Sequence, residues 1–305
     1  MAGVTDASYR QFIKMIAPET IVYTEFLSTD AIHYGAKKTL QMLSFDSALE
    51  RPFVVQVFGH DPKHFLSAAK VIEDLGADGI DINMGCPAAK VVSSCHGAAL
   101  LKNPELAAEL VAATVKAVNI PVSVKTRLGW DKDDALIPFC KKLVEAGASA
   151  LAIHGRRFCD KFTGAARWEQ IYELKKEVQV PVIGNGDIHS AEDAVQKIGN
   201  LDGVMVGRGT FGNPWVIREV LDALRTRDMG QGKWSSMAPK SFEEKIPFIL
   251  QHCELAVRIK GEQRGMLEMR RHLSSYVKGF PGASELRQKL VRVERYNDVK
   301  ALLIA

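Results

Sequence analysis

Two short segments decide the fold of this chain: PVSVKTRL at residues 121–128 and ALAIHG at residues 150–155. Each is a β-branched or apolar run of the kind that forms a strand buried on both faces of a parallel sheet. Between them, residues 134–146 have the apolar spacing of an amphipathic helix. The order of strand, helix and strand indicates a βα repeat, which continues in both directions along the chain.

The repeat predicts the secondary structure of most of the chain. Further strands are expected at Thr20–Phe26, Phe53–Gly59, Gly79–Gly85, Pro181–Gly186 and Gly203–Gly207, and further helices at Pro62–Leu75, Pro104–Val118, Trp168–Val178 and Ala191–Ile198. Seven strands are counted, and Met1-Ala2-Gly3 has the form of the end of an eighth, whose body would precede the first residue. Eight strands predict an α/β protein with a TIM (β/α)8 barrel, its first strand truncated, rather than an open sheet.

Strand signals stop after Trp215, and the rest of the chain has helical spacing. Residues 231–240 are polar with glycine and serine, which is typical of a linker. We therefore expect a barrel over residues 1–235 and a small all-helical C-terminal domain over residues 236–305. Residues 251–305 hold 11 Lys and Arg against 6 Asp and Glu. This asymmetry fits a polyanionic partner, and it also fits an ordinary solvated helical surface.

Composition excludes several classes of protein. Hydrophobic residues make up 47% and charged residues 25%, and no apolar run approaches the ~20 residues that span a bilayer. With no signal-peptide pattern, we expect a soluble cytoplasmic protein without a membrane segment. The five scattered cysteines include no C-x-x-C pair, which argues against disulfides and zinc. His60 and His64 have the spacing of metal ligands but lack a third ligand nearby in sequence, so no metal site is expected.

Polar residues recur at the carboxyl ends of the predicted strands, where barrel enzymes carry their reacting groups. In chain order they are Gln56, Asn83, Cys86, Lys125, Arg127, His154 and Arg156. Two glycine turns, Gly184-Asn185-Gly186-Asp187 and Gly207-Arg208-Gly209, end consecutive strands. Their backbone N–H groups favour a phosphate site over two purely structural turns.

Lys125 and Cys86 each allow a chemical and a structural interpretation. Lys125 could stabilise negative charge on a reduced flavin, or equally reach solvent or pair with a carboxylate. Cys86 precedes Pro87, so the chain must turn there and can present the thiol to the cavity. A protonated thiol is a usable general acid, although a small buried hydrophobe is the commoner role of a free cysteine.

Read in order, these motifs resemble the tRNA-dihydrouridine synthase family. The matching segments are Met1–Asp6, Gln56–Gly59, Asp81–Pro87, Lys90-Val91, Gly97–Leu101, Lys125–Arg127, His154–Arg156, Gly184–Asp187 and Gly207–Gly209. The resemblance implies a barrel with bound FMN that uses NADPH to reduce the C5=C6 bond of a D-loop uridine in tRNA. It implies that Cys86 donates the proton and that Asn83 and Arg127 face the uracil. It assigns the following residues to FMN: Ala2, Gln56, Lys125, His154, Asn185, Gly186, Asp187, Gly207 and Arg208.

The chain departs from the family pattern twice. Relatives carry residues ahead of Met-Ala-Gly that form the first barrel strand, so we expect a late start assignment or a truncated chain. Ser93-Ser94-Cys95-His96 stands where many relatives have glycines. In the family the helical domain contacts tRNA, and the basic residues suited to that role are Arg270, Arg271, Lys278, Arg287, Lys289, Arg292 and Arg295.

Two other functions compete with this interpretation. An FMN-dependent dehydrogenase of free pyrimidines, such as a dihydroorotate or dihydropyrimidine dehydrogenase, would not need a basic helical domain and has a different active-site turn. A non-catalytic tRNA-binding protein would keep the barrel only as a scaffold, and the retention of Cys86, Lys125 and both glycine turns argues against it. The sequence indicates no obligatory protein partner.

Overall fold

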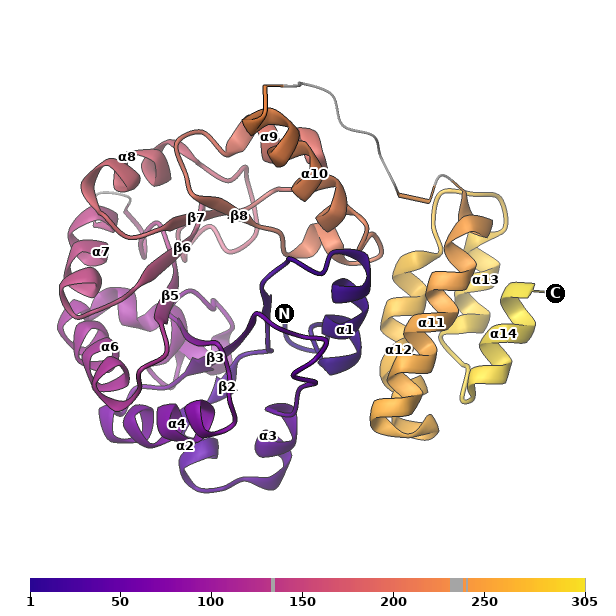
Figure 1. Ribbon diagram of the computed structural model, residues 1–305, viewed down its shortest axis with the longest axis horizontal. Helices are drawn as coiled ribbons and strands as arrows, with labels where there is room; N and C mark the ends of the chain where they lie inside the picture. The colour runs from indigo at the N-terminus through magenta and orange to yellow at the C-terminus, as the bar shows by residue number, and fades with distance from the viewer. Residues whose placement is uncertain (133–134, 231–237, 240, 305) are drawn as a thin grey trace.

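A parallel sheet curled into a barrel forms the larger part of the molecule (Figure 1). The computed structural model describes residues 1–132, 135–230, 238–239 and 241–304. Strands β1 (Val22–Tyr23) and β2 (Leu27–Ser28) both pair with β3 (Phe53–Phe58). Then follow, each parallel to the strand before it, β4 (Gly79–Asn83), β5 (Val122–Arg127), β6 (Ala150–His154), β7 (Val182–Asn185) and β8 (Gly203–Met205). The chain has the TIM-barrel fold expected from the βα repeat.

Helices cover the outside of the barrel (Figure 1). They are α4 (Pro62–Asp74), α6 (Pro104–Ala117), α7 (Leu136–Glu145), α8 (Glu169–Glu177), α9 (Ala191–Lys197) and α10 (Val216–Asp228). The five helices expected from sequence between strands agree with these to within two residues, although the start expected for α7 at residue 134 lies outside the described residues. Side-chain caps explain several starts: Asp61, Asn103 and Ser190 each accept a hydrogen bond from the first turn of the helix that follows.

The strand expected over Thr20–Phe26 is interrupted. Val22 and Tyr23 pair with β3, but the backbone N–H of Gln56 donates to the hydroxyl of Thr24 (2.9 Å) rather than to a neighbouring carbonyl. The side chain thus replaces one rung of the ladder, and pairing resumes only at Leu27. Sequence periodicity could not show this local substitution.

The eighth strand expected at Met1-Ala2-Gly3 is absent from the structure. Residues 1–6 form turns that lead into α1 (Ala7–Ile16), and the N-terminus lies between the ring of strands and α1 (Figure 1). Among the described residues, β8 pairs with β7 and β1 with β3, so no strand joins β8 to β1. The expectation of a strand at these residues was therefore wrong.

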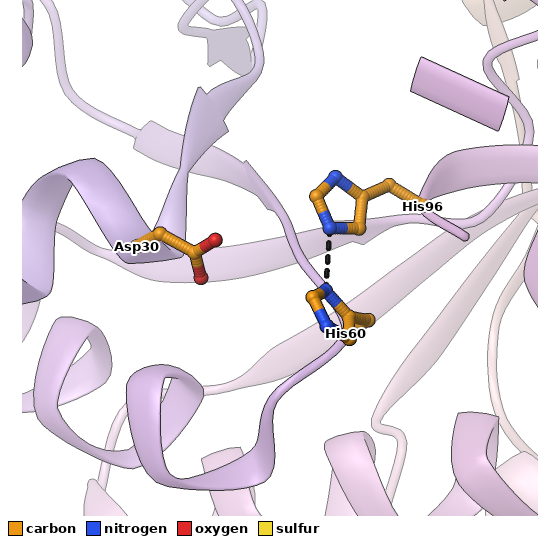
Figure 2. Close-up of side chains that lie close together, drawn as sticks. All are labelled: Asp30, His60 and His96. Carbon is orange, nitrogen blue, oxygen red and sulfur yellow. Dashed lines mark hydrogen bonds between the residues drawn. The ribbon is translucent and has the colours of Figure 1, made fainter. Parts of the chain in front are cut away.

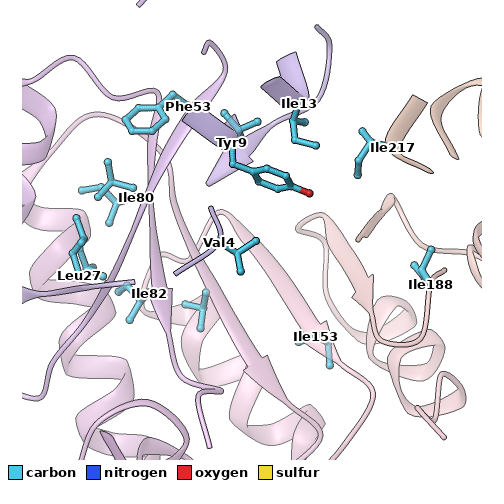
Figure 3. Close-up of a cluster of buried hydrophobic side chains, with 14 of the residues drawn as sticks. Val4, Tyr9, Ile13, Leu27, Phe53, Ile80, Ile82, Ile153, Ile188 and Ile217 are labelled. Carbon is cyan, nitrogen blue, oxygen red and sulfur yellow. The ribbon is translucent and has the colours of Figure 1, made fainter. Parts of the chain in front are cut away.

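Alternation along each strand separates the two faces of the sheet. Ile80, Ile82, Val124 and Ile153 are completely buried and point toward the surrounding helices, whereas the intervening residues are polar or small and point into the barrel. Figure 3 shows this apolar cluster extending to Val4 and to the side chains of α1. The polar residues that carry chemistry are thus held on rigid strands backed by a dry core.

Four helices after the barrel form a separate bundle that packs on α1 (Figure 1). They are α11 (Phe242–Lys260), α12 (Glu262–Tyr276), α13 (Ala283–Leu290) and α14 (Tyr296–Ile304). Phe12 of α1 stacks on His252 (ring centroids 4.8 Å) and Tyr9 on His272 (5.0 Å). The boundary expected after residue 235 and most of the expected linker at 231–240 lie outside the described residues. Within the part described, no helix has the length and apolar character needed to cross a membrane.

Candidate active site

The polar residues predicted at strand ends converge inside the barrel in three layers. Gln56, Asp81 and Ser123 are paired across β3, β4 and β5, and Asn83 is paired with Lys125 one step nearer the carboxyl ends. The last layer contains Arg127, His154 and Asn185, which are paired across β5, β6 and β7. Paired residues of parallel strands point to the same face, so each layer brings its side chains together.

The deepest layer is organised around the buried carboxyl group of Asp81. Its two oxygens accept hydrogen bonds from the Ser123 hydroxyl (2.7 Å) and from Nε2 of Gln56 (2.7 Å). Burial raises the pKa of Asp81 above its usual range. The Oε1 atom of Gln56 in turn accepts from Nδ2 of Asn83 (2.9 Å). The bond from Gln56 to Asp81 thus fixes the orientation of both side-chain amides.

Cys86 lies half-buried in a turn held mainly by side chains of neighbouring strands. The Oδ1 atom of Asn83 accepts from the backbone N–H groups of Gly85 (3.1 Å) and Cys86 (2.9 Å). The Cys86 carbonyl accepts from the N–H of Ala98 (3.2 Å), and Nε of Arg127 donates to the Gly85 carbonyl (2.7 Å). These contacts fix the backbone and leave the thiol available at the mouth of the barrel.

Arg127 is a buried cation that joins two loops. Besides its bond to Gly85, its Nη1 atom donates to the carbonyls of Arg157 (3.0 Å) and Lys161 (2.8 Å) in the loop after β6. Burial lowers its pKa to about 10, which leaves the guanidinium charged at neutral pH. A charge on Cys86 would raise the pKa of both Arg127 and Lys125, so the thiol lies within electrostatic reach of two cations.

Lys125 and His154 meet the residues of the first glycine turn. Nζ of Lys125 donates to Oδ1 of Asn185 (3.0 Å), and Nδ2 of Asn185 donates to the Met205 carbonyl (2.7 Å). Burial lowers the pKa of Lys125 to about 8. Burial, reinforced by the nearby cations, lowers the pKa of His154 to about 2, so its imidazole is neutral at physiological pH.

The two glycine turns combine free backbone donors with open space and a nearby cation. The backbone N–H groups of Gly186, Asp187 and Gly207 donate to no atom of the described residues, and the half-exposed Arg208 guanidinium lies beside them. Gly186 has φ +127°, a conformation that favours glycine, and a Cβ on Gly207 would meet nothing within 4 Å. Free N–H donors, open space and a cation are what a phosphate group requires.

Asp187 is held as a carboxylate by two arginines. Burial tends to raise the pKa of Asp187, but hydrogen bonds, chiefly that from Arg156, and the charges of both arginines together outweigh burial, and the pKa lies below its usual range. The Arg156 guanidinium lies 2.6 Å from the carboxylate and Arg208 lies 3.4 Å away. Asp187 thereby connects β6 to both glycine turns.

Ala2 stands apart from the three layers. Its carbonyl oxygen accepts a long hydrogen bond (3.5 Å) from Arg271 of α12, and the neighbouring Gly3 carbonyl accepts from the same guanidinium (3.0 Å). The N–H of Gly3 donates to the carboxylate of Glu25. These contacts place Ala2 where the barrel meets the helical bundle.

Comparison with known proteins identifies the family to which this arrangement belongs. A family model described as dihydrouridine synthase matches residues 1–304. The chain belongs to the dihydrouridine synthase family. It is 36% identical to a probable tRNA-dihydrouridine synthase 1 of Synechocystis, over 99% of this chain and 83% of that protein. It is also 38% identical to tRNA-dihydrouridine synthase B of Pseudomonas aeruginosa (96% and 87%) and to a probable tRNA-dihydrouridine synthase of Rickettsia bellii (94% and 86%).

Three residues that adjoin the site of this dihydrouridine synthase family member were not predicted from the sequence: Asp81, Ser123 and Phe162. Asp81 and Ser123 lie two positions before Asn83 and Lys125, and residues two apart on a strand share a face, which is the signal that could have found them. Phe162 is 53% exposed and lies between the guanidinium groups of Arg127 (5.4 Å) and Arg208 (5.1 Å). Its loop position gave no periodic signal, so only the folded structure reveals it.

Proposed function

We propose that this chain is a tRNA-dihydrouridine synthase that binds FMN, takes electrons from NADPH and reduces the C5=C6 bond of a D-loop uridine. The observation that carries the proposal is the position of Cys86. Its thiol is held at the mouth of a barrel, within electrostatic reach of Arg127 and Lys125, and the same rim of that barrel has, after β7 and β8, two turns with free N–H donors suited to a phosphate. The family and the named relatives give independent support.

The donor set fits FMN in two parts. The N–H groups of Gly186, Asp187 and Gly207, with the cation of Arg208, would hold the phosphate. The inward side chains of Gln56, Lys125, His154 and Asn185 would surround the ring. Ala2 is left out of this set, because its carbonyl is bound by Arg271 at the junction with the helical bundle. When bound, FMN supplies the hydride that is delivered to C6 of the uracil.

The protein's own groups manage charge and protons. The Lys125 ammonium stabilises negative charge in the ring site, while the neutral His154 adds a hydrogen-bonding group there without a second charge. The Cys86 thiol donates its proton to C5 as hydride reaches C6, which leaves a thiolate. Arg127 and Lys125 stabilise that thiolate until solvent protonates it again.

Asn83 and Arg127 then act mainly as positioning residues. The bonds of Asn83 to Gln56 and to the turn, and those of Arg127 to three backbone carbonyls, use most of their hydrogen-bonding groups. Asn83 and Arg127 can therefore contact the uracil only through the hydrogen-bonding groups that these internal bonds leave free. The exposed ring of Phe162 supplies an aromatic face for a base that must leave its stack to reach the site.

The test is to map dihydrouridine in tRNA from a strain that lacks this gene, before and after the gene is returned. We expect specific D-loop positions to lose the modification and regain it, and the purified chain to carry a flavin. Unchanged tRNA together with reduction of free pyrimidines by the purified protein would favour a dihydroorotate or dihydropyrimidine dehydrogenase instead. A colourless protein that binds tRNA without modifying it would favour a non-catalytic role.

A further inference from the structure

Three side chains with metal-ligating atoms meet at the rim of the barrel, outside the site described above (Figure 2). They are Asp30 in α2 (Thr29–His33), His60 directly after β3, and His96 before the 3-10 helix η1 (Gly97–Lys102). Nδ1 of His60 lies 2.6 Å from Nε2 of His96, and the ligand atoms of all three residues lie within 4.8 Å of one another. Residues far apart in sequence thus converge on one point.

We propose that Asp30, His60 and His96 bind a divalent transition-metal ion, and that the ion is Zn²⁺. Two imidazoles and one carboxylate match the ligands that zinc takes in proteins, whereas Ca²⁺ and Mg²⁺ prefer oxygen ligands alone. The two imidazole nitrogens already point at each other and would need to separate only to about 3.3 Å to share a tetrahedral ion. The fourth position would be filled by water.

Neighbouring residues hold two of the three ligands, Asp30 and His96, in place. Nδ1 of His64 lies 2.8 Å from Oδ1 of Asp30. The ring of His96 is buried and contacts the edge of Phe58 (5.5 Å). Partners that orient a ligand raise metal affinity, and mutation of such partners typically lowers it about 10- to 100-fold.

The charges at this point favour a cation. Asp30 and Asp61 supply carboxylates, which lie 2.8 Å and 3.9 Å from the ring nitrogens of His64. The close His60–His96 contact requires that one nitrogen donates and the other accepts. A metal ion replaces the shared proton and binds both nitrogens.

The ion would fix the segment that supports Cys86. His96 immediately precedes Gly97, where an added Cβ would lie 3.2 Å from Cβ of Cys86, and the N–H of Ala98 donates to the Cys86 carbonyl. A metal held also by Asp30 and His60 would tie this segment to α2 and to the end of β3. The binding site itself does not depend on the proposed reaction, so the two can fail separately.

The test is equilibrium dialysis of the untagged, chelator-treated full chain against ZnCl₂, with bound metal measured by mass spectrometry. We expect about one Zn²⁺ per chain, and a loss of affinity of about tenfold or more in His60→Gln and Asp30→Asn. His33→Gln is the matched control, because His33 stacks beside the cluster without supplying a ligand, and it should bind as the parent does. Equal zinc affinity in His60→Gln and His33→Gln would overturn the proposal.

Two further measurements keep the test decisive. Zn²⁺ should raise the midpoint of thermal unfolding of the parent and of His33→Gln but not that of His60→Gln; His60 is exposed, so its loss should leave the fold intact. Cys95 is exposed and adjacent to His96, so Cys95→Ser is assayed in parallel. Unchanged binding supports the three-ligand site, and loss of binding would overturn that ligand set.

Discussion

At the scale of single residues, Cys86 is held by its backbone, and its thiol forms no hydrogen bond with any residue that the structure describes. Asn83 from the same strand and Arg127 from the next strand bind the peptide groups of the turn. A thiol positioned in this way can donate its proton without first breaking a hydrogen bond of its own. Two residue-scale predictions follow from the proposed chemistry, one for Cys86 and one for Lys125.

Cys86→Ala should retain the flavin and tRNA binding but lower the rate of dihydrouridine formation about a hundredfold or more, because the general acid is lost. The rate is measured in single-turnover reactions by mass spectrometry of nucleosides, and flavin content by absorbance. Cys159→Ala, which removes an exposed thiol of the loop after β6 that contacts Asp160, should react at the parental rate. Near-normal turnover of Cys86→Ala would show that another acid protonates C5.

Lys125 should make FMN binding depend on pH. Its folded pKa is lowered to about 8, so the ammonium is charged below that pH and neutral above it. We therefore expect the affinity of the flavin-free protein for FMN to fall as pH rises through about 8. Fluorescence titration of FMN over this range measures it.

Two substitutions separate Lys125 from other titrating groups. Lys125→Met should bind FMN more weakly below pH 8, and its affinity should not fall further as the pH rises through 8. Lys125→Arg should remain charged, so its affinity for FMN should also not fall near pH 8. If Lys125→Met kept the parental pH profile, a different group would be responsible.

At the scale of elements, the ends of β7 and β8 have the same proposed task but tolerate different changes. Gly186 has φ +127°, and an added Cβ would lie 2.7 Å from Cβ of Ala166. Gly207 has no such restriction, because a Cβ there would meet nothing within 4 Å. One turn is therefore constrained by the fold, and the other only by what it binds.

This difference predicts opposite outcomes for two alanine variants. Gly186→Ala should lower the free energy of unfolding by about 1–3 kcal/mol, because it combines left-handed backbone strain with a steric clash. Gly207→Ala should change that free energy by less than about 0.5 kcal/mol and yet weaken FMN binding, because its methyl group would occupy space next to the phosphate. Denaturant unfolding and FMN titration of both variants test this; full FMN affinity in Gly207→Ala would remove that turn from the phosphate site.

At the scale of the whole molecule, the helical bundle is attached to the barrel by part of its own positive charge. Lys260 pairs with Asp6, and Arg258 donates to Gln11 of α1 (3.1 Å). Of the basic residues expected to face tRNA, Arg270, Arg271 and Arg287 donate to backbone carbonyls of Val293, Gly3 and Val277. These three arginines therefore use part of their hydrogen-bonding capacity inside the protein, and their contact with tRNA stays a prediction.

The other four of the seven basic residues expected to face tRNA are exposed, and they are the better candidates for phosphate contacts. They are Lys278, Lys289, Arg292 and Arg295. Changing all four to Gln should weaken tRNA binding and reduce the slope of log affinity against log salt by up to about one for each lost phosphate contact. Binding at several salt concentrations measures the slope.

The control for this variant removes four lysines from the outer barrel helices. Lys70, Lys116, Lys141 and Lys176 lie on α4, α6, α7 and α8, away from the bundle (Figure 1). Their change to Gln should leave the slope near the parental value. Equal loss of slope in both variants would indicate general charge attraction and would remove the bundle surface from a specific footprint.

The sequence alone determined the barrel, the order of its strands and the polar residues at their carboxyl ends. These features follow from local periodicity and from short motifs, which a linear reading contains. It did not determine the break after Tyr23, the internal bonds of Asn83 and Arg127, or the meeting of His60 with His96 instead of His64. Those depend on strand register and on packing between segments distant in the chain, and only the tertiary structure decides which side chains then meet.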